Sequence, residues 1–278
     1  MSNKVVCFSI LTLLIIKLIA IYFTQFSLYG DEAQYWLWSQ SLDFGYYSKP
    51  PLLAWFLFIF SFIFGSSFFS LKIFPIIIYL LISYGVYRIC LSLSLSKKNS
   101  LLCSASFLII PAASLSSFLI STDLLLLLFW SLSLSKLLET RKNDTALNFF
   151  LLGLYLGLAF LAKYAAVYFF ISLLLLIVID KKTLNVFKNN IYKSLTFLAT
   201  FVFILLPNIY WNLNNGWITL SHTSENANLQ NLNLNFYEPL KFIGAQILMV
   251  GPIIVVSFFL MLKYFYMDFE NKFLLIFS

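Results

Sequence analysis

Charged side chains are scarce in this sequence. They make up 10% of its 278 residues, whereas soluble domains carry about 25%. Hydrophobic residues make up 61% and the mean hydropathy is +0.91, against roughly 45–50% apolar residues in soluble proteins. This excludes a soluble globular domain, because no fold of this length could bury so much apolar surface. We therefore expect an integral membrane protein that is surrounded by membrane lipid.

The sequence also lacks clustered basic residues and clustered metal ligands. Its net charge is +7, but the lysines and arginines occur singly or in pairs between apolar runs. A nucleic-acid site needs a clustered basic face, so no nucleic-acid partner is expected. The three cysteines lie in apolar stretches without metal-ligand spacing and indicate packing residues. The single histidine, His222, and nearby Glu225 do not make a zinc site; no metal site is predicted, although a divalent metal stays open.

Long apolar runs dominate what is present. A helix of about 20 residues crosses a bilayer, and the first run, residues 5–26, is interrupted only by Lys17 and followed by no signal-peptide cleavage site. It is predicted as an uncleaved transmembrane helix. Residues 51–64 form a run too short to span, which favours an interfacial or re-entrant helix. The further predicted spans are residues 67–92, 99–121, 123–138, 146–162, 164–179, 193–211 and 239–264.

These runs predict an all-α integral membrane protein with about eight transmembrane helices, in one domain that covers residues 1–278. Cytoplasmic loops are enriched in lysine and arginine. With the N-terminus in the cytoplasm, the inner ends of the predicted spans hold thirteen of these residues and the outer ends hold four. The four are Lys49, Lys72, Lys163 and Lys241. This orientation places the first loop, residues 27–66, and the polar loop, residues 212–238, outside.

The stretch LYGDEAQYWLWSQSLDFGYYSKPPLLAWF, residues 28–56, places two adjacent carboxylates, Asp31 and Glu32, in the first outer loop. One interpretation is structural. Asp31 as an N-cap, with Gln34 three residues later, resembles a capping box that opens a helix over residues 32–42. The other interpretation is chemical, because a carboxylate held near the membrane surface can still accept a proton. The two interpretations are compatible.

Lys49 is followed by two prolines, which stiffen the backbone and start the next helix. An isolated lysine here could simply extend its ammonium group to the lipid interface. A cation about one short helix away from Asp31 also suits a reaction with a phosphate leaving group. The carboxylate would take a proton from the attacking hydroxyl, and the cation would offset charge that builds on the phosphate.

Asp123, in the motif LISTDLLLLLFW, occupies a second outer turn. Capping of the following helix by Thr122 or Asp123 explains this residue structurally. Lys163 and Tyr164, in GLAFLAKYAAVYF, occupy the next outer turn. The lysine is expected either to pair with Asp123 or to provide a second phosphate contact.

Four motifs in this order resemble the polyprenyl-phosphate-dependent membrane glycosyltransferases, the superfamily of the protein O-mannosyltransferases and the bacterial aminoarabinose transferases of lipid A. YGDEAQYWLWSQSLDFGYYSKPPLLAWF resembles the first outer loop of that family, and STDLLLLLFW resembles a Thr-Pro-Asp turn that heads a span. GLAFLAKYAAV is similar to a Gly-Leu…Ser-Lys-Tyr-Thr stretch, and LLPNIYWNLNNGWITL to a Pro…Trp-Asn…Gly-Trp segment. The resemblance covers essentially the whole chain. Thr122 stands where the family has proline, which leaves the role of that turn open.

The resemblance implies a glycosyltransferase C-type fold that acts at the outer face of the bacterial plasma membrane. The donor would be a sugar on a polyprenyl phosphate, with no further cofactor, and a single displacement would invert the anomeric centre. By position, Asp31 would be the general base, Glu32 the second member of the acidic pair, and Lys49 the ligand of the donor phosphate. The other candidate substrate contacts are Tyr35, Tyr47, Asp123, Lys163 and Tyr164.

The sequence leaves the sugar and the acceptor open; lipid A, another glycolipid, a polysaccharide and a protein all fit. A transporter or flippase for an amphiphile is an alternative, but it calls for ionisable residues near mid-membrane, where only Lys17 is clearly internal. A catalytically inactive membrane module is another alternative. The final residues, NKFLLIFS, begin an apolar run and stop, so the chain is expected to be the N-terminal portion of a longer enzyme.

Overall fold

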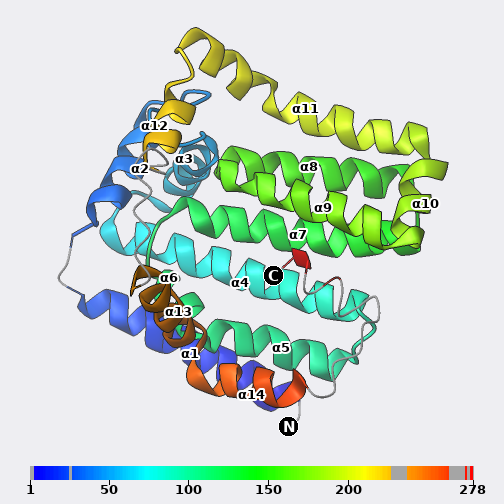
Figure 1. Cartoon of the computed structure of the whole chain (residues 1–278). Helices are drawn as coiled ribbons and strands as arrows, with labels where there is room; N and C mark the ends of the chain where they lie inside the picture. Colours follow the sequence, from blue (N-terminus) through cyan, green and yellow to red (C-terminus); the bar gives the residue numbers. More distant parts are fainter. Residues whose placement is uncertain (1–2, 25–26, 227–236, 263–272, 274–275, 278) are drawn as a thin grey trace.

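The computed structural model describes residues 3–24, 27–226, 237–262, 273 and 276–277 (Figure 1). Within these residues every regular element is a helix, and no strand occurs among them. This confirms the all-α prediction for the described part of the chain. Helices are the natural form of such apolar segments, because a helix satisfies all its backbone N–H and C=O groups without water.

The longer helices lie side by side with roughly parallel axes (Figure 1). α11 packs against α8, α8 against α7, α7 against α4, and α4 against α5. These helices are α1 (Asn3–Phe23), α4 (Phe68–Ser92), α5 (Lys97–Ile109), α7 (Thr122–Lys142), α8 (Ala146–Ala162), α9 (Val167–Ile179) and α11 (Ile191–Asn214).

The short helices occupy the two ends of this array. α2 (Gly30–Gln40), α3 (Leu52–Phe64) and α12 (Ile218–Asn226) gather at one end, which we call the site end, and α10 (Lys181–Asn189) lies at the other, the basic end (Figure 1). A 3₁₀ helix, η1 (Tyr164–Ala166), connects α8 to α9. The remaining helices are α6 (Pro111–Ser116), α13 (Tyr237–Val250) and α14 (Pro252–Leu262).

Close helix contacts depend on small residues, as in many membrane proteins. A Cβ atom at Gly153 of α8 would collide with the backbone carbonyl oxygen of Phe197 in α11. Glycine therefore allows these two helices to pack backbone against backbone. Tyr164, which follows α8 in η1, therefore lies beside the polar end of α11 at the site end.

Three helices, α1, α4 and α11, are long and apolar enough to cross a membrane among the described residues. A fourth span results if α9 and α10, which are bent by 104° relative to each other, count as one. The predicted first span therefore has the required length and composition. The predicted number of about eight spans is not confirmed, because other apolar helices are short: α8 has 17 residues and α3 has 13.

Two predicted spans are divided in the structure. Residues 99–121 break between α5 and α6, which begins at Pro111, because proline has no N–H with which to continue a helix. Residues 239–264 break at Gly251, whose φ of 96° is readily adopted only by glycine. The predicted outer loop, residues 212–238, is partly helical, since it includes the end of α11 and all of α12; residues 227–236 lie outside the described residues.

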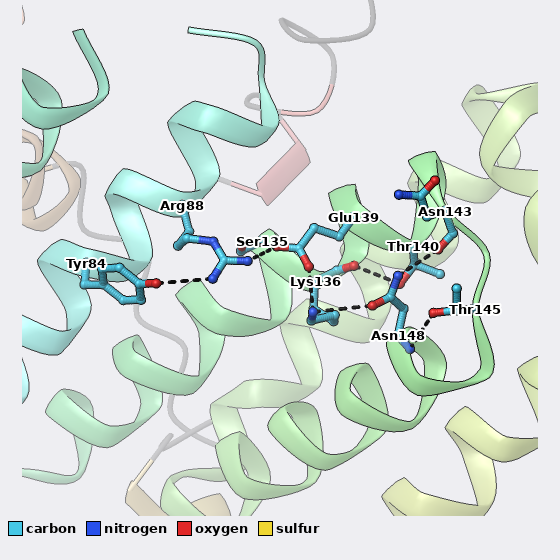
Figure 2. A network of polar contacts seen from close by, with 9 residues as sticks. All are labelled: Tyr84, Arg88, Ser135, Lys136, Glu139, Thr140, Asn143, Thr145 and Asn148. Carbon is cyan, nitrogen blue, oxygen red and sulfur yellow. Dashed lines mark hydrogen bonds and ion pairs between the residues drawn. The ribbon is translucent and has the colours of Figure 1, made fainter. Parts of the chain in front are cut away.

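Polar side chains connect three helices near the basic end. Figure 2 shows Arg88 of α4 and Lys136 of α7 contacting the same carboxylate, that of Glu139. Lys136 Nζ also lies 3.4 Å from Asn148 Oδ1, which extends the network to α8. Contacts of this kind connect α4, α7 and α8 at the end far from α2. They therefore help to fix the helices that carry the site end.

Candidate active site

At the start of α2, the two adjacent carboxylates of the first loop have different surroundings. Glu32 Oε2 accepts a hydrogen bond from the backbone N–H of Tyr29, the N-cap residue, at 2.8 Å. The prediction that Asp31 caps a helix together with Gln34 is therefore wrong. The helix begins at Gly30, earlier than predicted, because a glutamate at the third helical position can reach back to the cap amide. Asp31 is left exposed in the first turn.

Glu32 is buried, with only 2% of its surface exposed. Its two carboxylate oxygens lie 2.6 and 2.7 Å from Lys72 Nζ of α4. Oε1 also accepts a hydrogen bond from the backbone N–H of Ile120, at 2.8 Å. Both oxygens of Glu32 are thus occupied, whereas no described residue donates a hydrogen bond to the carboxylate of Asp31. Of the two carboxylates, Asp31 is the exposed one.

Tyr35 lies one turn after Asp31 on α2 and is buried. Burial, together with the negative charges of Asp31 and Asp123, raises the pKa of its phenol from 10.0 to about 12. Both carboxylates are therefore close enough to Tyr35 to influence its ionisation. The phenol stays protonated at neutral pH and is available as a hydrogen-bond donor.

Asp123 and Lys163 form an ion pair between α7 and the end of α8, with 2.6 Å between Oδ1 and Nζ. Of the two roles foreseen for the lysine, the structure has the pairing with Asp123. The N-cap of α7 is Ser121 rather than Thr122 or Asp123, so the capping prediction is wrong. Asp123 instead occupies the first turn of α7, where a negative charge is favoured by the helix dipole. Both charged side chains are partly exposed.

Lys49 and Lys163 line one pocket of about 320 Å³ together with Tyr164. The pocket therefore collects two of the cations and one of the tyrosines that the sequence singled out. The backbone carbonyl of Lys49 accepts a hydrogen bond from the N–H of Tyr46 at 3.1 Å, which closes a turn in front of the two prolines. Among the described residues none forms an ion pair with the Lys49 ammonium group.

Aromatic side chains fix the first loop on α2 and α3. The rings of Trp38 and Tyr46 stack with their centroids 4.7 Å apart, and the Tyr46 hydroxyl donates to the carbonyl of Trp38 at 3.0 Å. Trp55 Nε1 donates to the carbonyl of Asp43 at 2.9 Å. Lys49 is therefore carried on a loop whose turns are held from within.

Three side chains of α11 and α12 hold the same loop from the other side. Asn208 Nδ2 donates to the carbonyl of Phe44 at 2.6 Å, and Thr219 Oγ1 donates to the carbonyl of Tyr46 at 2.6 Å. Tyr47 is mostly exposed, but its ring stacks on that of His222 at 4.8 Å. His222 thus packs against a predicted substrate contact.

Tyr164 is tied to the polar end of α11. Its hydroxyl donates to Asn208 Oδ1 at 2.9 Å and accepts from Asn212 Nδ2 at 3.1 Å. The sequence did not indicate these asparagines as site residues, and it placed Lys72 only among the outer cations. Two polar amides four residues apart in the otherwise apolar LLPNIYWN stretch were the available signal for Asn208 and Asn212.

The arrangement has an acidic side and a cationic side. Asp31, Tyr35 and Asp123 belong to the first, and Lys49 and Lys163 border the pocket on the second. The Asp123–Lys163 pair joins the two sides. No three metal-ligating side chains gather anywhere in the described part of the chain. Chemically, the site offers a carboxylate for proton transfer and two ammonium groups for an anion.

Comparisons with known proteins found a family match and a curated relative. Residues 48–211 match a family described as dolichyl-phosphate-mannose-protein mannosyltransferase. The chain is 31% identical over 258 residues to the lipid A galacturonosyltransferase RgtD of Rhizobium johnstonii. The match covers 88% of this chain and 50% of that protein, so the chain spans about half the length of the curated relative it matches. No solved structure matches.

Proposed function

Because this chain belongs to the dolichyl-phosphate-mannose-protein mannosyltransferase family, we propose that it is a membrane glycosyltransferase. It moves a sugar from a polyprenyl-phosphate donor to an acceptor of the cell envelope. The observation that carries this proposal is the pocket that holds both Lys49 and Lys163; the exposed carboxylate of Asp31 lies in α2, at the same end of the helices. A sugar phosphate needs cations for its leaving group, and an attacking hydroxyl needs a base.

The proposed reaction is one displacement at the anomeric carbon. The acceptor hydroxyl attacks this carbon and transfers its proton to Asp31. The bond between the anomeric carbon and the phosphate oxygen breaks, and the polyprenyl phosphate leaves with the bonding electron pair. Lys49 and Lys163 offset the negative charge that develops on that phosphate. Attack opposite the leaving group inverts the anomeric centre.

The surroundings of Glu32 support a mechanism with one carboxylate. Glycosidases use a second carboxyl group, commonly to protonate a poor leaving group, but a phosphate leaves as a stable anion. Glu32 is committed to Lys72 and to two backbone amides. We therefore assign proton transfer to Asp31 alone. A correctly placed base accelerates a reaction by about 10²–10⁴-fold.

We further propose that the site end faces the periplasm of a bacterial inner membrane and that the basic end faces the cytoplasm. The distribution of lysine and arginine supports this orientation. A glycolipid is the acceptor that the comparison favours, because the related protein from Rhizobium johnstonii is named for its action on lipid A. No feature of the site favours a transporter: the exposed carboxylate and the pocket cations gather at one end of the helices.

The test compares envelope lipids and glycans by mass spectrometry in cells that produce the wild-type chain, Asp31→Asn or Asp43→Asn. Asp43 is a matched control in the same loop, since its Oδ1 accepts a hydrogen bond from the Phe44 amide at 2.7 Å and asparagine retains such an acceptor. Membrane abundance of all three proteins is checked by immunoblot. We expect one sugar mass to disappear with Asp31→Asn, as in a deletion strain, and to persist with Asp43→Asn. If Asp31→Asn keeps a product that the deletion loses, Asp31 is not the base.

A further inference from the structure

Lys72 and Glu32 form a buried ion pair in which each polar atom has a partner. The ammonium group of Lys72 contacts both oxygens of Glu32 and donates to the carbonyl of Phe118 at 3.1 Å. Glu32 in turn accepts hydrogen bonds from the amides of Tyr29 and Ile120, both at 2.8 Å. The pair therefore joins three segments: the start of α2, the first turns of α4 and the turn before α7.

Two of the residues in these contacts, Glu32 and Ile120, lie close in the chain to residues of the candidate site. Asp31 directly precedes Glu32 in the first turn of α2. Asp123 lies three residues after Ile120, in the first turn of α7. Because only Ser121 and Thr122 separate Ile120 from Asp123, and Asp31 adjoins Glu32, fixing Glu32 and Ile120 also restricts the two exposed carboxylates. Ser121, the N-cap of α7, makes no side-chain capping bond, so the Ile120 amide held by Glu32 is a main anchor at this helix end.

An ion pair of this burial is not explained by stability alone. The side chains of Lys72 and Glu32 are 11% and 2% exposed, and buried pairs are often no more stabilising than apolar residues of similar volume. Their geometry, however, is well defined, because each charged group needs its partners at fixed positions. Such a pair suits a place where two segments must meet with little freedom.

We propose that Lys72 and Glu32 are positioning residues, which set the spacing between Asp31 and the Asp123–Lys163 pair. This rests on the proposed function, in which Asp31 is the base and Lys163 borders the phosphate pocket. The distance from base to leaving group then depends on how α2 and α7 are joined. A misplacement of about 1 Å costs on the order of 10²-fold in rate.

The test measures kcat, the KM for donor and the melting temperature of full-length protein in lipid nanodiscs, using Lys72→Met, Glu32→Gln and the double variant. The assay uses a polyprenyl-phosphate sugar donor and the envelope acceptor identified by the mass spectrometry above. Arg141→Met is the matched control. Arg141 Nε pairs with Asp180 Oδ2 at 3.1 Å near the basic end, and these side chains are also largely buried, 14% and 17% exposed.

We expect all single variants to lower the melting temperature, because each leaves a buried charge without its partner. Only Lys72→Met and Glu32→Gln should lower kcat, by about 10²-fold, with the KM for donor within about twofold of wild type. The double variant separates position from stability: removing both charges restores most of the melting temperature, but kcat stays low because the three segments are no longer joined.

Two results would overturn the positioning role. One is a kcat that is unchanged in Lys72→Met once the folded fraction is accounted for. The other is a double variant in which kcat returns together with the melting temperature, since a purely structural pair would behave in this way. Asp31→Asn, measured in the same assay, distinguishes this failure from a failure of the proposed function. If Asp31→Asn is inactive while Lys72→Met keeps its kcat, only the positioning role is wrong; if Asp31→Asn is fully active, both proposals fall.

Discussion

Asp123 and Lys163 are 40 residues apart in the chain, yet their side chains meet at 2.6 Å where α7 begins and α8 ends. Lys163 also borders the pocket that contains Lys49. The lysine therefore has the Asp123 carboxylate as its partner in the structure and the donor phosphate as its partner in the proposed complex. In that proposal, the carboxylate holds the ammonium group at the pocket until the phosphate binds.

Replacing Lys163 with methionine tests this double role. The pair is partly exposed, with 34% and 54% of the two side chains accessible, and such pairs contribute only about 0–1 kcal/mol to stability. We therefore expect a melting temperature close to wild type. A lost hydrogen bond to a charged group costs about 1.5–3 kcal/mol, so the KM for donor should rise by roughly 10–100-fold. Lys241→Met, at another exposed ion pair, is the control and should leave the KM unchanged. An unchanged KM in Lys163→Met would show that the lysine does not bind donor.

Pairing with Asp123 is one of the two roles that the sequence predicts for Lys163. Both residues are charges placed in outer turns between apolar runs, where few partners of opposite charge are available. The scarcity of charge made the pairing easy to predict. The same reasoning predicted Lys49 near the site, because outward-facing cations are few.

The role of Glu32 could not be read in the same way. Adjacent carboxylates look equivalent in a sequence, and only the contacts of Glu32 with Lys72 of α4 and with the Ile120 amide distinguish the buried one from the exposed one. Its partner, Lys72, lies 40 residues away inside an apolar run. Similarly, the contact between Asn208 and the Phe44 carbonyl joins residues 164 positions apart. Contacts of this kind depend on how helices pack, which local patterns do not contain.

Asp144, in the loop between α7 and α8, is expected to contribute to the stability of the fold in a pH-dependent way. A hydrogen bond from Asn190, together with the nearby charge of Lys193, lowers the pKa of the Asp144 carboxyl below 3.8. A lowered pKa in the folded state stabilises the protein above pH 3.8, and this contribution is lost as the pH falls through the folded-state pKa. Asp144→Asn should therefore melt slightly below wild type at pH 7, and the two melting curves should converge below pH 3.8. Because Asp144 is exposed, added salt should also reduce the difference. A difference that does not shrink as the pH falls below 3.8 would refute this origin.

Tyr35 makes a contrasting prediction for alkaline pH. Its pKa is raised from 10.0 to about 12, so the neutral phenol is the form present up to about pH 11. The raised pKa gives a contribution to stability that is present below pH 10.0 and lost as the pH rises through 12. In activity, Tyr35→Phe should lower kcat/KM by about two- to tenfold, the effect of one neutral hydrogen bond of about 0.5–1.5 kcal/mol. The pH–rate profiles of the two proteins should have the same shape between pH 6 and 10. An alkaline limb present in wild type and absent from Tyr35→Phe would contradict the raised pKa.

The first loop approaches α11 closely at Gly45. A Cβ atom there would collide with the indole ring of Trp211, so we expect Gly45→Ala to push the loop that carries Lys49 away from α11. Overpacking of this kind costs about 1–3 kcal/mol, and a loop shift of about 1 Å should lower kcat/KM by up to 10²-fold. Gly30→Ala is the matched control, because a Cβ at Gly30 meets no atom within 4 Å although it adjoins Asp31.

A second substitution decides whether the collision itself is responsible. Trp211→Leu removes the ring. The Gly45→Ala/Trp211→Leu double variant should therefore have a higher kcat/KM than the sum of the two single losses in free energy predicts. Purely additive losses in the double-mutant cycle would mean that Gly45 matters for another reason. Rescue, by contrast, would show that the first loop packs against the end of α11. The family match ends in this helix, at residue 211, and the helix would then also set the position of Lys49, the proposed phosphate ligand.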